Sequence, residues 1–330
     1  MANDNAVIYY EASQTAVTMA ALMDSGDHKF FESAGELWSN ASGAEAVVRP
    51  DGVASGGAIT PGAADQVAVA ALTCYQGGAL RIISAVEALD VARPTLANAK
   101  YSIVIDGSQA VTAIKGTESA SAVSDVRGAE GGPPLIPVGQ IEIGQIHITS
   151  ADSGVYTASE IKQIVGVHME RFDFPTWTEK RMNVVNNVAG AAGVEFTAAL
   201  PPIHTGGVSK TVYASYFEPD FAEVPDSSDF TPPETTHSTS STQIYGKTLG
   251  AASSTLGQGS FTAYLKDGVT DALLSKKNEN IFFKFKPDRL KTPYILCQGK
   301  LGVARSFPAG DNITAACTVS ATEGAVEVTS

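Results

Sequence analysis

The feature that most constrains the fold is a period-two alternation of side chains, which is clearest near the C-terminus. From Ile313 to Ala321 the odd positions are apolar or small, and the even positions are Thr, Ala or Ser. Because successive side chains of a strand point to opposite faces, this pattern predicts a half-buried β-strand. A turn expected at Gly324 would return the chain through Val326 and Val328, so we predict a closing hairpin.

Strand signals of this kind recur along most of the chain, and they predict a mainly β fold. The predicted strands cover 7–10, 101–107, 110–116, 141–149, 165–174, 194–200, 211–219, 260–268, 281–287 and 294–302. Gly144 stands where the alternation of 141–149 changes phase, which indicates a β-bulge. Short helices are expected after the capping-box pattern at Thr157 and after Thr270. The segment 81–91 fits either a helix or a strand.

A break at 130–137, with the sequence Glu-Gly-Gly-Pro-Pro-Leu-Ile-Pro, divides the chain, since two glycines followed by two prolines interrupt any regular element. We predict a β-rich accessory domain over 1–133 and a second β domain over 134–330. In an alternative division the strand at 7–10 joins the second domain, and the accessory part is inserted from about Gly43. A long loop rich in Pro, Ser and Gly is expected at 218–259, and loops of this length are normally functional or disordered.

Composition excludes several classes of protein. The 330 residues include only 17% charged residues and carry a net charge of −13, so a basic nucleic-acid-binding surface is not expected. A surface this low in charge suits a protein covered by neighbouring subunits. The N-terminus does not resemble a signal peptide, and no apolar run approaches the roughly 20 residues that span a bilayer. We therefore expect cytoplasmic folding and no membrane partner, with Cys74, Cys297 and Cys317 as small buried residues.

Motifs for common chemistries are incomplete. The Gly-Lys-Thr at 246–248 would need a glycine at Ser241 to form a phosphate-binding loop. The glycines at 257 and 259 are followed by Thr262 where a dinucleotide-binding motif needs a third glycine. Histidines 28, 147, 168, 204 and 237 lie far apart, which leaves only a metal site built from scattered residues open. We expect no catalytic residue, no metal and no cofactor, and hence no enzyme.

One acidic stretch is a candidate for function. Between residues 211 and 246 the sequence holds six carboxylates and neither Lys nor Arg. A stretch of one sign creates a local negative field, although solvated loop charges or a glycosidase pair would produce the same pattern. The carboxylates singled out as candidate site residues are Glu218, Asp220, Glu223, Asp226 and Asp229.

The order of these segments carries a family resemblance. A strand, turn and short helix at 260–274, a strand at 281–287, and a strand broken at Phe307–Pro308 before the closing alternation form one series. Together with GGPPLIPVGQIEIGQI and SYFEPDFAEVPDSSDFTPPETTHSTSSTQIYG, this series resembles tail tube proteins, the major tail proteins of long-tailed, non-contractile bacteriophages. It is most similar to those of the Chi-like, flagellum-dependent group, and the resemblance covers about 130–330.

The resemblance implies a tail-tube β-sandwich or barrel with a short helix, to which the accessory β-rich domain is added. It implies a structural virion protein that forms stacked six-subunit rings around a negatively charged channel for genome delivery. The implied partners are copies of the same chain, other tail proteins at the tube ends, and DNA in transit without specific binding, and the implied location is the virion tail after assembly in the host cytoplasm. The long loop becomes an element between rings, with candidate residues Thr236, His237, Gln243, Tyr245 and Lys247.

Two other functions fit a mainly β chain. A receptor-binding or fibre protein with a carbohydrate-binding β domain would form trimers and expose aromatic residues, for which Trp38 and Trp177 are the available tryptophans. A hydrolase on a β scaffold would need a cleft with a perturbed carboxylate, and the sequence marks none.

Overall fold

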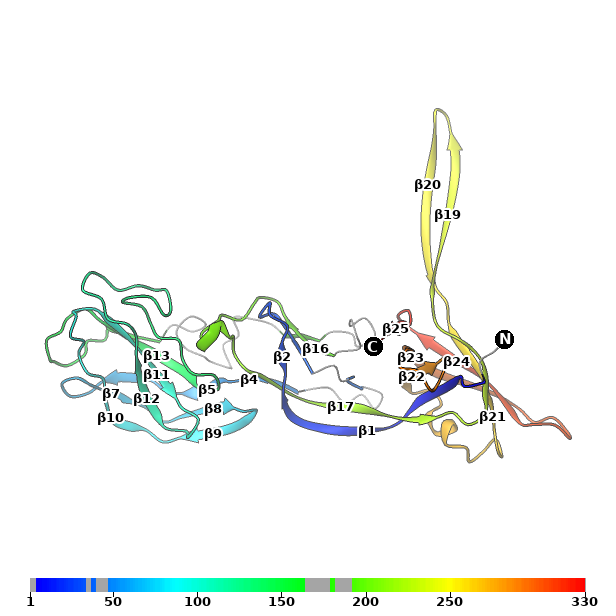
Figure 1. Ribbon diagram of the computed structural model, residues 1–330, viewed down its shortest axis with the longest axis horizontal. Coiled ribbons are helices and arrows are strands. Elements are labelled where there is room, and N and C mark those ends of the chain that lie inside the picture. Colours follow the sequence, from blue (N-terminus) through cyan, green and yellow to red (C-terminus); the bar gives the residue numbers. More distant parts are fainter. Residues whose placement is uncertain (1–3, 34–36, 40–46, 164–178, 182–191, 330) are drawn as a thin grey trace.

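The computed structural model describes residues 4–33, 37–39, 47–163, 179–181 and 192–329. Antiparallel sheets dominate it, with 53% of the residues in strands and 3% in helices, so the predicted mainly β class is confirmed. Figure 1 shows an elongated molecule, with a group of short strands at one end and a large sheet running to the other. A long hairpin stands out from the end that carries the N-terminus.

The large sheet has nine strands and contains both the start and the end of the chain. Its strands are β1 (Val7–Ala21), β4 (Val47–Pro50), β17 (Val212–Glu223), β18 (Ser227–Thr231), β21 (Gly259–Tyr264), β22 (Asn280–Lys286), β23 (Tyr294–Ser306), β24 (Thr314–Ala321) and β25 (Val326–Val328). Their order is β18-β21-β24-β23-β22-β1-β17-β4, and β25 also pairs with β23. The N-terminal strand therefore belongs to the same sheet as the C-terminal half, as the alternative division of the chain expected.

Strand β24 has the predicted alternation. Ala315, Cys317 and Val319 are buried, and they pack in a core with Phe261 and Phe283. The predicted closing hairpin is wrong, however, because β25 does not fold back on β24. Both strands pair in sequence along the same strand β23, so the chain continues in one direction past residue 324. The true hairpin is formed by β23 and β24.

The strands at the other end form a unit of their own, here called the distal unit, over residues 51–163. It contains β5 (Gly52–Gly56), β6 (Ile59–Pro61), β7 (Gln66–Val69), β8 (Leu72–Gln76), β9 (Ala79–Ile83), β10 (Val86–Asp90), β11 (Ala99–Ile105), β12 (Val111–Lys115), β13 (Ile141–Ile148) and β14 (Ile161–Lys162). They form the sheets β5-β8-β9, β10-β7-β6 and β12-β11-β13-β14 around one apolar core. The ambiguous segment 81–91 is thus strand, in β9 and β10.

The domain boundary expected between 133 and 134 lies inside the distal unit. Strand β13 follows this point in the sequence yet pairs with β11, which precedes it. The two glycines allow close packing here, since a Cβ at Gly131 would stand 2.3 Å from the Ala122 carbonyl oxygen and one at Gly132 would stand 2.1 Å from that of Val126. The Gly-Gly-Pro-Pro segment is therefore a packed loop of the distal unit.

A small sheet lies between these parts. It consists of β2 (Met23–Asp24), β3 (Phe30–Glu32), β15 (Glu179–Arg181) and β16 (Gly193–Phe196), in the order β15-β16-β3-β2. Phe31 and Phe196 meet edge to face with ring centroids 5.6 Å apart, and they share a core with Tyr216 of β17. This core attaches the small sheet to the long β1–β17 ribbon. The strand predicted at 165–174 falls outside the described residues.

The long loop predicted at 218–259 is instead almost entirely strand. It contains the end of β17, strand β18, and an isolated pair, β19 (Thr235–Ile244) and β20 (Lys247–Leu256). This pair is the hairpin that projects in Figure 1, and we call it the projecting hairpin. Its Ser-, Thr- and Gly-rich sequence lacks apolar alternation, so periodicity could not distinguish it from a loop.

The two predicted helices have different outcomes. After Thr270 the chain forms a short 3-10 helix, η3 (Ala272–Lys276), although its flanking N-terminal residue is Asp271. A second one, η2 (Thr205–Gly207), was not anticipated. At Thr157 the expected helix is wrong, because the chain makes a turn and enters β14. The bulge predicted at Gly144 is confirmed, since the β11–β13 register shifts between the partners Gly144 and Glu142.

Candidate assembly surface

The projecting hairpin is a two-stranded sheet that extends away from the large sheet (Figure 1). Ten consecutive cross-strand pairs join β19 to β20, and its sheet contains these two strands alone among the described residues. The turn is made by Tyr245 and Gly246, and Gly246 has a φ of 85°, a left-handed value that suits glycine. No described residue of the hairpin belongs to either of the two apolar cores that contain strands of the large sheet.

The side chains that the structure describes on the hairpin are unpacked on both faces. The side chains described on β19 are exposed from Thr235 to Gln243, and those on β20 are exposed from residue 250 to Thr255. Internal contacts are weak and polar, such as the 2.7 Å hydrogen bond between the hydroxyls of Ser238 and Ser253. A two-stranded hairpin without a hydrophobic face is marginally stable in water, so a covering surface is expected.

All the residues predicted for an inter-ring element lie on this hairpin. Thr236 and His237 are near its base, where they pair with Thr255 and Ser254. Gln243 lies near the tip opposite Thr248, Lys247 opens β20, and Tyr245 is at the tip itself with an exposed fraction of 107%. The five candidate residues thus lie together on one projecting element, whose strand conformation the sequence analysis did not predict.

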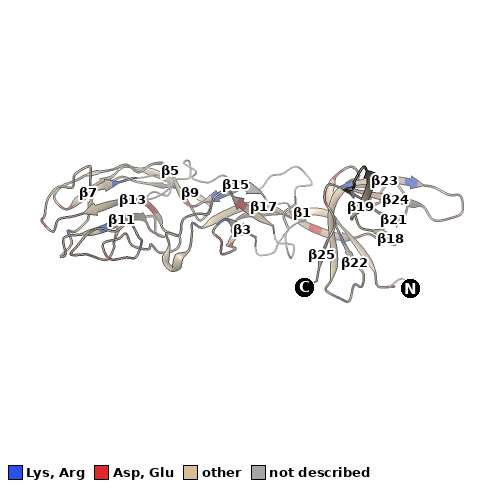
Figure 2. Cartoon of the chain, turned by 90° about the horizontal axis from the view of Figure 1, so that it is seen from above, with Lys and Arg blue, Asp and Glu red and all other residues tan. Residues whose placement is uncertain are grey.

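The predicted acidic residues do not form one cluster. Glu218 and Asp220 share one face of β17, whereas Glu223, at odd spacing from them, lies on the other face. Asp226 lies in the turn after β17, and Asp229 belongs to β18. Figure 2 likewise shows acidic residues scattered from the distal unit to the large sheet. A continuous acidic surface within one copy is therefore not present among these five residues.

Several of these carboxylates have local partners. Asp220 accepts hydrogen bonds from the hydroxyls of Ser13 (3.0 Å) and Thr15 (2.8 Å), both on the neighbouring strand β1. Glu223 forms a 3.0 Å ion pair with Arg289 in which both side chains are nearly half exposed. Exposed pairs of this kind contribute little to stability, roughly 0–1 kcal/mol. These contacts hold the carboxylates at the sheet surface.

Nucleophilic and metal-binding groups are dispersed. The three cysteines are buried as predicted, and burial raises the pKa of Cys74 to about 11 and those of Cys297 and Cys317 to about 12. Burial also lowers the pKa of His204 to about 4. Within the described residues no group of three or more His, Cys, Asp or Glu side chains is placed to hold a metal ion. In the same part of the chain, no helix is long and apolar enough to cross a membrane.

Trp38, a candidate sugar-stacking residue of the fibre alternative, is buried. Its ring stacks on Tyr216 with centroids 4.9 Å apart and an interplanar angle of 22°. A buried ring cannot offer its face to a ligand. Trp177 falls outside the described residues.

Sequence reasoning missed two exposed apolar features. Leu80 and Ile82 point to solvent from β9, the edge strand of its sheet, with exposed fractions of 54% and 79%. Leu80 and Ile82 are two residues apart, as side chains on one face of a strand are. The segment 81–91 also fitted a helix, so this exposed pair was not recognised. A pocket at the base of the projecting hairpin was also missed, because its lining residues come from three distant parts of the sequence.

Comparisons with known proteins gave no match to a family model, to a curated protein or to a solved structure.

Proposed function

We propose that this chain is a structural subunit that assembles with copies of itself, as a tail tube protein of a long-tailed, non-contractile bacteriophage. The observation that carries the proposal is the projecting hairpin, whose described side chains are exposed on both strands. Ordering about 20 residues costs roughly 1–2 kcal/mol of backbone entropy per residue. A polar hairpin without a core recovers this poorly alone, and a second subunit that covers it would supply the missing contacts.

The sheet edges support the same function. Strand β18 ends the large sheet on one side and pairs only with β21 in the described part of the chain. Unpaired edges invite addition of another strand, and closed rings remove them. Because β18 leads directly into the hairpin, one subunit offers a free edge for lateral contact and an arm for axial contact. Head-to-tail contacts of this kind build rings and stacks from a single chain.

The net charge of −13 suits a channel for DNA. Cationic side chains around a channel would bind phosphate and slow the genome, whereas a negative lining repels it. The partly dispersed carboxylates on β17 and β18 would then be brought together by neighbouring copies. In this function the protein has no substrate and no cofactor.

Removing the hairpin tests the proposal. Replacing residues 235–256 by a short Gly-Ser turn should leave the subunit folded, because neither core contains a described residue of this segment. We expect the wild type to form six-fold rings or tubes in negative-stain images and the variant to remain monomeric or to stop at single rings. Circular dichroism and the elution volume report folding.

Long tubes formed by the deletion variant would contradict the role of the hairpin. Compact monomers of the wild type at all concentrations would contradict self-assembly, and trimers would favour the fibre alternative. As a matched control, Thr242→Ala changes one exposed hairpin residue while it keeps the strand pairing, and should assemble as the wild type does.

A further inference from the structure

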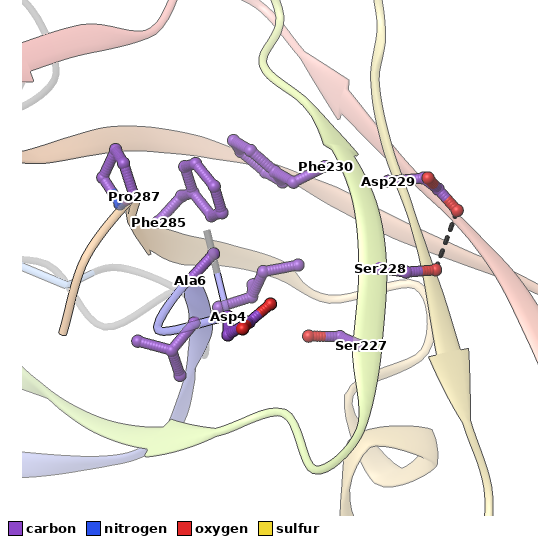
Figure 3. Close-up of a pocket in the computed structure, with 10 residues that line it drawn as sticks. Asp4, Ala6, Ser227, Ser228, Asp229, Phe230, Phe285 and Pro287 are labelled. Carbon is purple, nitrogen blue, oxygen red and sulfur yellow. Dashed lines mark hydrogen bonds between the residues drawn. The ribbon is translucent and has the colours of Figure 1, made fainter. Parts of the chain in front are cut away.

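The tip and the base of the projecting hairpin have complementary chemistry. Tyr245 at the tip is a fully exposed aromatic residue, in a segment whose other exposed residues are mostly small and polar. At the base lies a pocket of about 520 Å³, shown in Figure 3. It is an open pocket lined by the start of β1, by β18 and by the end of β22.

The pocket has an aromatic wall and a polar rim. Phe230 and Phe285 stack with centroids 4.6 Å apart, and Pro287 and Ala6 lie beside them (Figure 3). On the polar side, the exposed carboxylate of Asp4 and the hydroxyl of Ser227 face the pocket, whereas Ser228 and Asp229 point away from it across β18 (Figure 3). Tyrosine suits such a site, because its ring is apolar and its hydroxyl needs a polar partner.

We propose that Tyr245 of one copy inserts into the pocket lined by Phe230 and Phe285 of a second copy. This inference rests on the proposed function and names the contact that joins successive layers. Lys247 follows Tyr245 by two residues and the segment 235–256 contains no carboxylate, so the charge at the tip complements the Asp4 carboxylate beside the pocket.

The placement of the two features explains how the contact repeats. Phe230 precedes Thr235 by five residues, so the pocket lies at the foot of the same hairpin that carries Tyr245. A ten-residue strand spans roughly 34 Å. A second copy shifted along the hairpin by about this length brings its own pocket to the tip of the first. Each copy has one tip and one pocket. The same contact can therefore repeat from copy to copy, and the stack extends without closing.

Cross-linking tests the contact directly. A photoreactive benzoyl-phenylalanine at position 245 keeps an aromatic ring at the tip. In assemblies prepared from an equal mixture of ¹⁵N-labelled and unlabelled protein, we expect cross-links to peptides that contain Ser227–Thr231 or Phe285, with mixed isotope composition. Assemblies that cross-link elsewhere, or only within one copy, would overturn the docking proposal and leave the proposed function standing. Failure of the wild type to assemble at all would overturn both.

Two substitutions separate the tip from the pocket. Tyr245→Ala removes the aromatic ring, and Ala6→Trp fills the pocket from an exposed position. We expect each to raise the concentration needed for stacking at least tenfold, while Tyr245→Phe and the exposed hairpin variant Thr242→Ala change it less than threefold. A mixture of Tyr245→Ala and Ala6→Trp retains one productive tip-to-pocket contact, so it should form two-layer complexes that neither variant forms alone. Normal stacking of Ala6→Trp alone would reject the pocket.

Discussion

At the scale of single residues, Asp51 is a buried carboxyl group with a large pKa shift. Its side chain is 3% exposed where β4 passes into the distal unit, and it accepts a 2.9 Å hydrogen bond from the backbone of Gly77. Burial raises the pKa of Asp51 to about 7, although the charge of Lys210 and the hydrogen bonds act against the shift. A carboxyl group of this kind releases its proton at a cost to the folded state.

The pH dependence of stability follows from this shift. Because the folded-state pKa lies above the unfolded value of 3.8, the folded protein binds more protons between pH 4 and 7, and stability falls as pH rises through that window. The full effect of one group shifted this far is on the order of 4 kcal/mol. Asp51→Asn should remove it, so the difference in unfolding free energy between variant and wild type should grow from pH 4 to 7 and then stay constant. Chemical unfolding at several pH values measures this difference.

His204 changes the stability with pH in the opposite direction to Asp51. The effect of Asp51 must therefore be measured as the difference between the variant and the wild type. Burial lowers the pKa of His204 to about 4, so its contribution is present above pH 6.5 and is lost as pH falls toward 4. The two groups partly cancel in the wild type, whereas the difference between variant and wild type isolates Asp51. A pH profile for Asp51→Asn that runs parallel to that of the wild type would contradict the assignment.

At the scale of elements, sequence reasoning succeeded where one face of a strand is buried. The alternation of β24 is visible in the sequence because one face of this strand lies in the core and the other meets water. Sequence reasoning failed where pairing with another strand decides the conformation of a segment. The direction of β25 depends on β23, and the projecting hairpin depends on cross-strand hydrogen bonds that leave no apolar pattern.

At Thr157 the capping-box signal for a helix start is present, but it forms part of a turn before β14. The Glu160 carboxylate does accept a 2.7 Å hydrogen bond from the Thr157 backbone, as a capping box requires. The same carboxylate also binds Arg93 at 2.9 Å, and the chain then pairs with β13. The ion pair and the sheet therefore override the helix. The candidate site was found by sequence as a segment, while its tip-and-pocket geometry needed the three-dimensional arrangement.

Close approach of β23 and β24 gives an element-scale prediction. A Cβ at the buried Gly299 would stand 2.7 Å from Val319 Cγ1, and Val319 is fixed in the core. Gly299→Ala should therefore destabilise the fold by about 1–3 kcal/mol, as overpacking does. On the same strand, a Cβ at Gly302 would meet the exposed Thr318 hydroxyl, which can rotate away, so Gly302→Ala is the matched control. Denaturant unfolding of both should show the larger loss for Gly299→Ala, and equal losses would contradict the packing argument.

At the scale of the whole molecule, the distal unit is separate from the assembly surface. Figure 1 places it at the opposite end from the projecting hairpin. Its main core is formed by residues between Val53 and Ile161. In the proposed tube it would lie away from the hairpin contacts.

The closed core of the distal unit leads to the last prediction. A fragment covering 51–163 keeps β5 to β14 and the ion pairs by which Arg93 joins Asp65 (3.3 Å) and Glu160 (2.9 Å). It should fold alone and unfold in one cooperative thermal transition, because the residues of its main apolar core all lie within the fragment. The shorter fragment 51–133, which follows the boundary first expected, lacks β13 and should stay unfolded, since β11 would lose the strand that covers its edge. Circular dichroism and amide dispersion in NMR spectra measure both, and a folded 51–133 fragment would show that β13 is dispensable to the unit.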